Sequence, residues 1–313
     1  CSCVNYDRKN QNELSMKYLL TIGLMMTLFS ANAQVPQPLY SGEIPNYIAG
    51  PNMESSAITG GILRISNVTD PVYTLYLAPE NQQAKKPLVI IFPGGGYRIL
   101  AASHEGSDIA RKLNEIGVHA MVVHYRLPDS TRQVEKQFAP LQDAQQAIRV
   151  ARQSANLWNV DSTKIGVMGF SAGGHLAASA ATHFQTDFTK INDGQNLRPD
   201  FQLLIYPVVT FRSYSHQGSV NSLLGKNKSE EMLHLFSNEE QVNATTPRAF
   251  IVHAADDGAV PVANALNYAA ALSNYKVPVD LHIMAKGGHG FGLTNKTTEE
   301  YWFDRLATWF KTF

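Results

Sequence analysis

Short apolar runs alternate with amphipathic stretches along most of the chain. The runs are typical of β-strands and lie at residues 61–68, 72–77, 87–92, 118–125, 164–168, 201–206, 249–254 and 279–284. Helical periodicity predicts helices at about 105–116, 140–156, 172–184, 261–276 and 298–312. The run PLVIIF at 87–92 is apolar at almost every position, which is typical of a strand buried on both faces.

Strands that alternate with helices predict an α/β fold with a mostly parallel central sheet and helices on both faces. We expect the first two strands, 61–68 and 72–77, to form an antiparallel pair, because only a turn at Asp70-Pro71 separates them. The connection 207–248 is long and polar, with a short helix predicted near 229–237. It is interpreted as a small insertion rather than a large lid.

A leader-like segment precedes these elements. Residues 16–34 read MKYLLTIGLMMTLFSANAQ, which is a charged residue, an apolar core and then an A-x-A site. This order is that of a secretory signal peptide, although a buried N-terminal helix is the alternative. We expect residues 1–33 to be an upstream segment and signal peptide cleaved after Ala33, with 34–313 forming a single domain. A periplasmic or secreted bacterial location follows, with no membrane span in the mature form.

Charge and cysteine content narrow the classes of function. Lysine and arginine number 26, as do aspartate and glutamate, and no basic cluster is present, so nucleic acid is not an expected partner. Cys1 and Cys3 both precede the expected cleavage site, so the mature chain would use no disulfide, cysteine nucleophile or Cys-ligated metal.

A serine follows the strand 164–168 directly. Ser171 lies between Gly169 and Gly173 in GFSAG, ahead of a predicted helix, and strand–turn–helix is the context of a nucleophile elbow. Active sites of parallel sheets gather at the carboxyl ends of strands. Ser171 is therefore the candidate nucleophile, and the alternative is a serine that merely caps the helix.

A histidine and two aspartates follow the last two strands. His289 lies in the glycine-rich segment KGGHGFGL and is the candidate base, with a surface histidine as the alternative. Asp256 and Asp257 follow the strand 249–254. We favour Asp257 as the acid and Asp256 as a turn or helix-capping residue. The alternative is that both aspartates are carboxylates at a helix N-terminus.

A triple glycine in FPGGGY follows the strand 87–92. Inward-facing N–H groups can stabilise an oxyanion, and glycines allow them to face inward. We expect Gly95, Gly96 and the N–H of Ala172 to form an oxyanion hole. A phosphate loop is the alternative, but the G-x-x-x-x-G-K-S/T pattern is absent from the sequence. No cofactor or metal is expected, since histidines and carboxylates do not cluster at ligand spacing.

The chain order is oxyanion loop, Ser171, Asp257 and His289, which is the order found in α/β-hydrolases. This order predicts the α/β-hydrolase fold and hydrolysis through an acyl-enzyme. His289 would take the proton of Ser171, and Asp257 would orient the imidazole ring.

These motifs resemble those of a known family. Six segments resemble those of secreted bacterial carbohydrate esterases, the acetyl-xylan-esterase-like α/β-hydrolases. These segments are PGGGYRILAASHEG, YRLP, GFSAGGHLAAS, HQGSVNSLLG, HAADDGAVPVANAL and KGGHGFGL. The resemblance spans about 60–313. It implies a Ser171–Asp257–His289 triad and removal of acetyl groups from an acylated carbohydrate, decorated xylan or its oligosaccharides. Some members are labelled xylanases, but the motifs here are those of acyl transfer and not of a glycosidase.

Specificity and oligomeric state stay open at this point. A carboxylesterase or feruloyl esterase of broader acyl specificity is the main alternative, followed by a peptidase relative or a non-catalytic binding protein. Several further side chains are candidates for supporting roles. Those expected to support the oxyanion loop are Tyr97, His104 and Glu105, with Glu105 not catalytic. Those that are either sugar contacts or ordinary surface residues are Phe211, Arg212, Tyr214 and His216.

Overall fold

The computed structural model describes residues 34–79, 84–225 and 228–312. The chain divides into two compact units, Cys1–Val35 and Pro36–Phe313, and the second contains every element described below. The predicted signal peptide, with Cys1 and Cys3, lies outside the described residues and stays a prediction. Within the described ranges, no helix combines the length and apolar character needed to cross a membrane.

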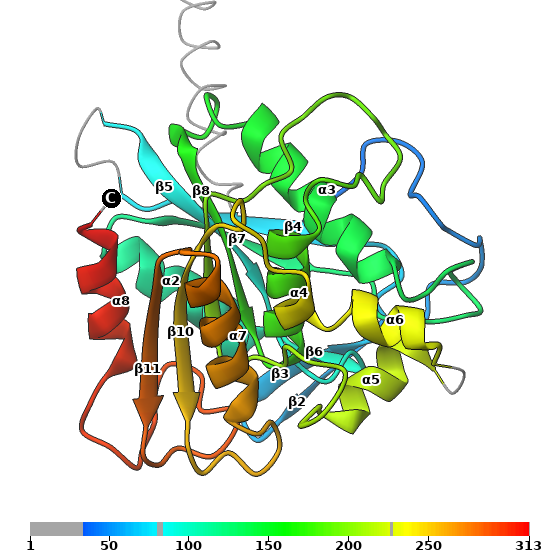
Figure 1. The fold of residues 1–313 in the computed structure, drawn as a ribbon. Coiled ribbons are helices and arrows are strands. Elements are labelled where there is room, and N and C mark those ends of the chain that lie inside the picture. Colours follow the sequence, from blue (N-terminus) through cyan, green and yellow to red (C-terminus); the bar gives the residue numbers. More distant parts are fainter. Residues whose placement is uncertain (1–33, 80–83, 226–227, 313) are drawn as a thin grey trace, which may run out of the picture. The chain divides into compact units, whose positions relative to one another are not determined.

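A central sheet of eight strands runs through the unit Pro36–Phe313 (Figure 1). The strands are β1 Gln37–Pro38, β4 Val72–Tyr76, β5 Lys86–Phe92, β7 His119–His124, β8 Val160–Phe170, β9 Phe201–Ile205, β10 Arg248–Ala254 and β11 Val279–Met284. Their order is β1-β4-β7-β5-β8-β9-β10-β11. Neighbours from β7 to β11 pair in parallel, whereas β4 pairs antiparallel with β1 and β7. The predicted mostly parallel sheet is confirmed.

Helices cover both faces of this sheet (Figure 1). The helices are α2 Asp108–Glu115 and α8 Trp302–Phe310 on one face, and α3 Ala139–Gln153, α4 Ala172–Thr182 and α7 Ala263–Asn274 on the other. Strand β5 contributes to both cores: Leu88 and Ile90 pack with α3, α4 and α7, whereas Val89 and Ile91 pack with α2 and α8. Successive side chains of a strand point to opposite faces, so a continuous apolar run fills two cores.

A second, three-stranded sheet was not predicted. It consists of β2 Ser55–Thr59, β3 Ile62–Ser66 and β6 Ile99–Ala101, joined antiparallel in the order β2-β3-β6. The expected pairing of 61–68 with 72–77 is therefore wrong, because β3 and β4 belong to different sheets. Gly60 and Gly61, with φ of 59° and 78°, form the two-residue turn between β2 and β3. Two glycines between strand-like runs are a hairpin signal that identifies this pairing.

The long connection between β9 and β10 contains more helix than its polar sequence predicts. The predicted helix is present as α6 Glu230–Leu235, and α5 Gln217–Leu224 and a 3₁₀ turn, Asn238–Glu240, accompany it. Side-chain caps mark both helix starts: His216 accepts from the N–H of Ser219, and Ser229 accepts from that of Met232. The segment is a small helical insertion, as expected.

Helix α4 approaches the sheet without intervening side chains. A Cβ atom on Gly169 would lie within 3.0 Å of the backbone of Gly173, and one on Gly173 would lie within 3.0 Å of the carbonyl oxygens of Phe92 and Pro93. Real Cβ atoms essentially never reach such separations. The glycines of GFSAG therefore let the start of α4 contact the ends of β5 and β8.

We expect Gly173→Ala to lower the free energy of unfolding by about 3 kcal/mol, because overpacking forces backbone shifts. The loss would occur although alanine favours helix formation more than glycine does. Urea denaturation measures the effect. Gly42→Ala is the control, since a Cβ there would meet no atom within 4 Å. Equal unfolding midpoints for the two variants would contradict the close contact.

Candidate active site

The chemically important residues predicted from the sequence meet at the carboxyl ends of the central strands. Ser171 follows β8, Asp257 follows β10 and His289 follows β11. The Nε2 atom of His289 lies 2.8 Å from Ser171 Oγ, and its Nδ1 atom lies 2.7 Å from Asp257 Oδ2. The structure thus joins the three side chains in one line of hydrogen bonds.

Ser171 occupies a strained turn. Its φ of 52° and ψ of −119° lie in a region that residues with a side chain rarely adopt. Hydrogen bonds hold this backbone on both sides, since the N–H donates to Ile205 O and the carbonyl accepts from Val208 N and His175 N. The hydroxyl makes no capping bond to α4. The geometry is that of a nucleophile elbow and not of a helix-capping serine.

The carboxylate of Asp257 is fully enclosed and hydrogen-bonded on both oxygens. Oδ1 accepts from the N–H groups of Ala259 and Val260, each at 2.9 Å, and Oδ2 accepts from His289. Burial alone would raise the pKa of Asp257, but hydrogen bonds from His253, His289 and Val260 lower the pKa well below its usual value. Asp257 is therefore ionised.

The ionised carboxylate fixes the proton on His289. A carboxylate only accepts hydrogen bonds, so Nδ1 of His289 carries the hydrogen and Nε2 presents its lone pair to the hydroxyl of Ser171. The His289 side chain is 24% exposed, so one edge of the imidazole stays accessible from the cavity. This is the tautomer that a base acting on Ser171 needs.

A second histidine, His253, was missed by sequence reasoning. It is fully buried, and its Nε2 atom lies 2.9 Å from Val260 O and 3.2 Å from Asp257 Oδ2. Carbonyl oxygens only accept hydrogen bonds, so Nε2 carries the proton and shares it between these two acceptors. The histidine four residues before Asp257 in HAADD was the available signal.

Asp256 fixes the loop that carries His289. Its exposed carboxylate accepts from the N–H of Gly288 at 2.8 Å. Of the two expected roles the turn role is confirmed, since Asp256 lies in the turn after β10. The helix-capping role is wrong, because α7 begins only at Ala263 with Val262 as its N-cap. The two neighbouring aspartates therefore hold the same loop, one through the imidazole and the other through the backbone.

The triple glycine lies against the serine. A Cβ on Gly94 would come to 3.0 Å from Ser171 Cβ, and Gly95 and Gly96 have positive φ of 138° and 64°. No described residue accepts a hydrogen bond from the N–H of Gly95 or Gly96. The N–H of Ala172 is at the first residue of α4, where it has no acceptor within the helix. These three donors are free for a ligand, as an oxyanion hole requires.

Glu105 connects the glycine loop to the loop of His289. It is 4% exposed, and its Oε2 accepts from Gly94 N at 2.8 Å while Oε1 accepts from the hydroxyl of Tyr206 at 2.8 Å. That hydroxyl in turn accepts from the N–H of Gly292 at 3.0 Å. Burial raises the pKa of Glu105, and the bonds from Tyr206 and Gly94 oppose the rise. Tyr206, at the end of β9, was not singled out from the sequence.

Two more predicted supports are in place. The hydroxyl of Tyr97 donates to Nδ1 of His175 at 2.8 Å, and His175 donates through Nε2 to Phe236 O. His104 donates through Nε2 to Gly290 O at 2.9 Å. The glycine loop is thus tied to α4, and its neighbouring segment is tied to the loop of His289.

Of the four candidate sugar contacts, the structure places His216 alone in the cavity around Ser171. Phe211 is 2% exposed and stacks on His175 at 4.2 Å between ring centroids. Arg212 forms ion pairs with Glu230 and Glu240, and Tyr214 does not line this cavity. These three are structural or surface residues of the insertion.

The cavity has a volume of about 400 Å³. The residues that line it are Ile62, Arg64, Gly95, Gly96, Arg98, Ile99, Ala101, His104, Glu105, Ser171, His216, His289 and Gly290. His216 accepts from Ser219 N through Nδ1, so its neutral ring carries the hydrogen on Nε2. Across the described ranges, histidine and acidic side chains do not gather in groups of three that could hold a metal ion.

We expect Glu105→Ala to lower the free energy of unfolding at neutral pH by about 2 kcal/mol. The substitution leaves the buried N–H of Gly94 and hydroxyl of Tyr206 without an acceptor. Glu105→Gln keeps one acceptor oxygen and should lose less. Urea denaturation of the two variants measures the difference. A Glu105→Ala protein as stable as the parent would rule out this network as a support of the loops.

The chain is similar to several known proteins. The BD-FAE family matches residues 74–272. Endo-1,4-beta-xylanase B of Butyrivibrio fibrisolvens is 38% identical over 225 residues, which are 71% of this chain and 35% of that protein. An acetylxylan esterase of Xylanibacter ruminicola is 35% identical over 238 residues, 74% of this chain and 44% of that protein. The chain thus spans less than half the length of these two relatives.

A solved structure matches over nearly its whole length. The acetyl ester-xyloside bifunctional hydrolase from Caldicellulosiruptor lactoaceticus has 35% sequence identity and a TM-score of 0.75, covering 89% of this chain and 96% of that one. The carboxylesterase Cest-2923 from Lactobacillus plantarum, at 24% identity and a TM-score of 0.62, covers 83% and 94% and shares the fold. The chain therefore belongs to the BD-FAE family, and its α/β-hydrolase domain is similar to an acetylxylan esterase and to an acetyl ester-xyloside hydrolase.

Proposed function

We propose that this chain is a serine esterase that removes O-acetyl groups from plant-type polysaccharide or oligosaccharide. The observation that carries the proposal is the line of hydrogen bonds from Asp257 through His289 to Ser171, beside the free N–H groups of Gly95 and Gly96. The names of the relatives support the substrate class, since they refer to acetylxylan, xylan and acetyl esters.

The first chemical step is attack of Ser171 on the acetyl carbonyl. Nε2 of His289, 2.8 Å from Oγ, takes the hydroxyl proton as the Oγ–C bond forms. The ionised Asp257 stabilises the resulting imidazolium through Nδ1. His289 then gives the proton to the sugar oxygen as the C–O ester bond breaks, and an acetyl group remains on Ser171.

Water completes the cycle by the same route. His289 accepts a proton from water, the hydroxide oxygen bonds to the acetyl carbon, and acetate leaves as the proton returns to Ser171. In both steps a negative charge develops on the carbonyl oxygen. The N–H groups of Gly95, Gly96 and Ala172 would stabilise that charge by about 3 kcal/mol each.

The presence of a single carboxyl group among the described lining residues favours ester over glycoside hydrolysis. A glycosidase needs two carboxyl groups on either side of the scissile bond. Of the described residues that line the cavity, Glu105 alone has a carboxyl group, and both of its oxygens already accept hydrogen bonds. The described lining residues therefore include no carboxylate pair free for sugar hydrolysis.

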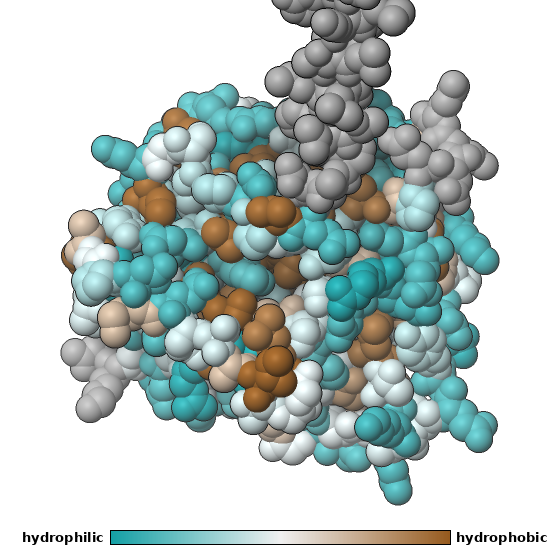
Figure 2. Space-filling model, turned by 180° about the vertical axis from the view of Figure 1, so that it is seen from behind, coloured by the Kyte–Doolittle hydropathy of each residue, from teal (hydrophilic) through white to brown (hydrophobic). Residues whose placement is uncertain are grey.

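The described part of the insertion 207–248 lacks the apolar cover expected for lipid esters. Among the described residues of 207–248, Tyr214 is the one large hydrophobic side chain that is exposed, at 62%. On the face shown in Figure 2, hydrophilic residues predominate and hydrophobic ones lie in small groups between them. With one exposed large hydrophobic side chain, the described part of 207–248 suits a polar carbohydrate better than a lipid.

We expect Ser171→Ala to reduce acetate release from acetylated xylan by roughly 10⁴-fold or more, because the residual rate would come from the oxyanion hole and binding alone. An enzymatic acetate assay measures it, with p-nitrophenyl acetate and feruloyl esters in parallel. Ser273→Ala, at an exposed position of α7, is the control. Unchanged turnover in Ser171→Ala would overturn the proposal, and faster feruloyl than acetyl release would favour a feruloyl esterase.

We expect Asp257→Asn to lower kcat about 10³-fold, because an amide in this place favours the wrong tautomer of His289. Asp256→Asn is the matched control, since an asparagine oxygen can still accept from Gly288 N. Similar kcat values for the two variants would contradict the assignment of the acid.

A further inference from the structure

Two arginine side chains in the cavity around Ser171 have no partner within the described chain. Arg64 comes from β3 and Arg98 from the segment directly after the triple glycine, and both are exposed. Neither forms an ion pair, a side-chain hydrogen bond or a ring contact with any described residue. The other described arginines all have guanidinium hydrogen bonds, and they are Arg111, Arg126, Arg132, Arg149, Arg152, Arg198, Arg212, Arg248 and Arg305.

The positive charge of these arginines is uncompensated inside the cavity. Glu105 is the one carboxylate among the described lining residues, and it is buried with both oxygens engaged by Gly94 and Tyr206. The carboxylate of Asp257, behind His289, already accepts hydrogen bonds from the imidazole and from two backbone N–H groups. The chain as a whole has a formal net charge of zero, so the local excess reflects where the charges are placed.

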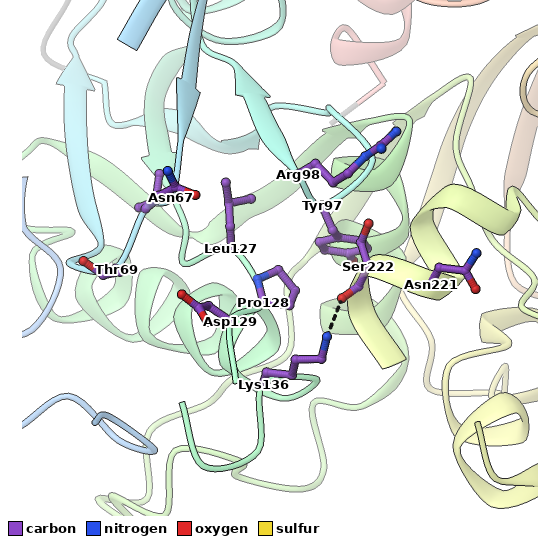
Figure 3. A pocket seen from close by; sticks show the side chains of 11 residues that line it. Asn67, Thr69, Tyr97, Arg98, Leu127, Pro128, Asp129, Lys136, Asn221 and Ser222 are labelled. Atoms are coloured by element: carbon purple, nitrogen blue, oxygen red, sulfur yellow. Dashed lines mark hydrogen bonds between the residues drawn. The ribbon is translucent and has the colours of Figure 1, made fainter. Parts of the chain in front are cut away.

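Arg98 also lines a neighbouring cavity of about 390 Å³, shown in Figure 3. An acidic residue, Asp129, lines the same cavity, but its Oδ1 accepts from the N–H and hydroxyl of Thr131. Figure 3 shows the guanidinium of Arg98 directed away from Asp129, while Lys136 donates to Ser222 O at 3.1 Å. Arg98 therefore lines both cavities, and its guanidinium is free to bind a ligand.

We propose that Arg64 and Arg98 bind a carboxylate carried by the substrate, so that the preferred carbohydrate has an acidic sugar, a uronic acid, near the acetylated position. The inference rests on the proposed esterase function and specifies its substrate class. A guanidinium can present two parallel N–H donors to a carboxylate, which gives both affinity and orientation. Two such groups beside Ser171 would place the acetylated hydroxyl relative to the nucleophile.

The test compares two acetylated xylo-oligosaccharides of equal length, one neutral and one with a uronic acid branch. The readout is the ratio of their kcat/KM values for acetate release. We expect the parent enzyme to favour the acidic substrate by about fivefold to tenfold, the range of one or two exposed charge pairs. High salt should reduce this preference, because it screens exposed charges.

Variants assign the preference to the arginines. Arg64→Gln and Arg98→Gln should each lower the ratio, and the double variant should bring it to about one. Arg98→Lys keeps the positive charge but loses the bidentate hydrogen-bond geometry, so its kcat/KM ratio should lie between those of the parent and of Arg98→Gln. Arg305→Gln is the control, since it removes an exposed arginine of α8 that does not line the cavity. Hydrolysis of p-nitrophenyl acetate by each variant reports whether the catalytic residues are intact.

The possible failures are distinguishable. A parent enzyme that releases acetate from both oligosaccharides at equal efficiency, or a double variant that keeps the preference, would overturn the role of the arginines and leave the esterase function standing. A preference seen instead for a p-nitrophenyl hemisuccinate over the acetate would place the carboxylate on the acyl group and also overturn the inference. No Ser171-dependent acetate release from either oligosaccharide would overturn the function and the inference together.

Discussion

The candidate active site depends on direct backbone contact between the start of α4 and the ends of β5 and β8. Because no side chain separates Gly173 from the carbonyls of Phe92 and Pro93, the segment that continues from β5 must pass beside the residue that begins α4. Ser171 and the glycine N–H groups are therefore placed by rigid main chain, which has few ways to relax. Preorganised donors of this kind are effective because they need little rearrangement as charge develops.

Side chains then couple the loops that the sheet only brings near. Glu105 joins the glycine loop to Tyr206, and Tyr206 joins the loop of His289, so a shift in either loop would disturb a buried carboxylate. Such a group is costly to bury, and it is tolerated because every oxygen has a donor. The same principle applies at Asp257, whose four hydrogen-bond donors hold it ionised beneath the imidazole.

The sequence predicts those features that have a local cause. The strand 279–284 was predicted with its observed bounds, and Ser171, Asp257 and His289 were found because each follows a strand in a glycine-rich or turn-like segment. The pairing of distant strands is harder to predict from the sequence. Strand β3 pairs with β6, where Arg64 lies opposite Ala101, and no residue pattern near β3 specifies this pairing. For the same reason Tyr206 and the burial of Phe211 could be recognised only once distant elements were in place. His253 differs from these two, because its contact with Asp257 is local.

The small sheet β2-β3-β6 supplies side chains that line the cavity, and the central sheet positions the candidate catalytic residues. Ile62 and Arg64, two residues apart on β3, both reach the cavity, whereas the serine, aspartate and histidine all follow strands of the central sheet. Residues two apart on a strand share one face, so substitutions on that single face would change the lining of the cavity without altering Ser171, Asp257 or His289. Side chains on this face of the hairpin can therefore be exchanged without any change to the strands that Ser171, Asp257 and His289 follow.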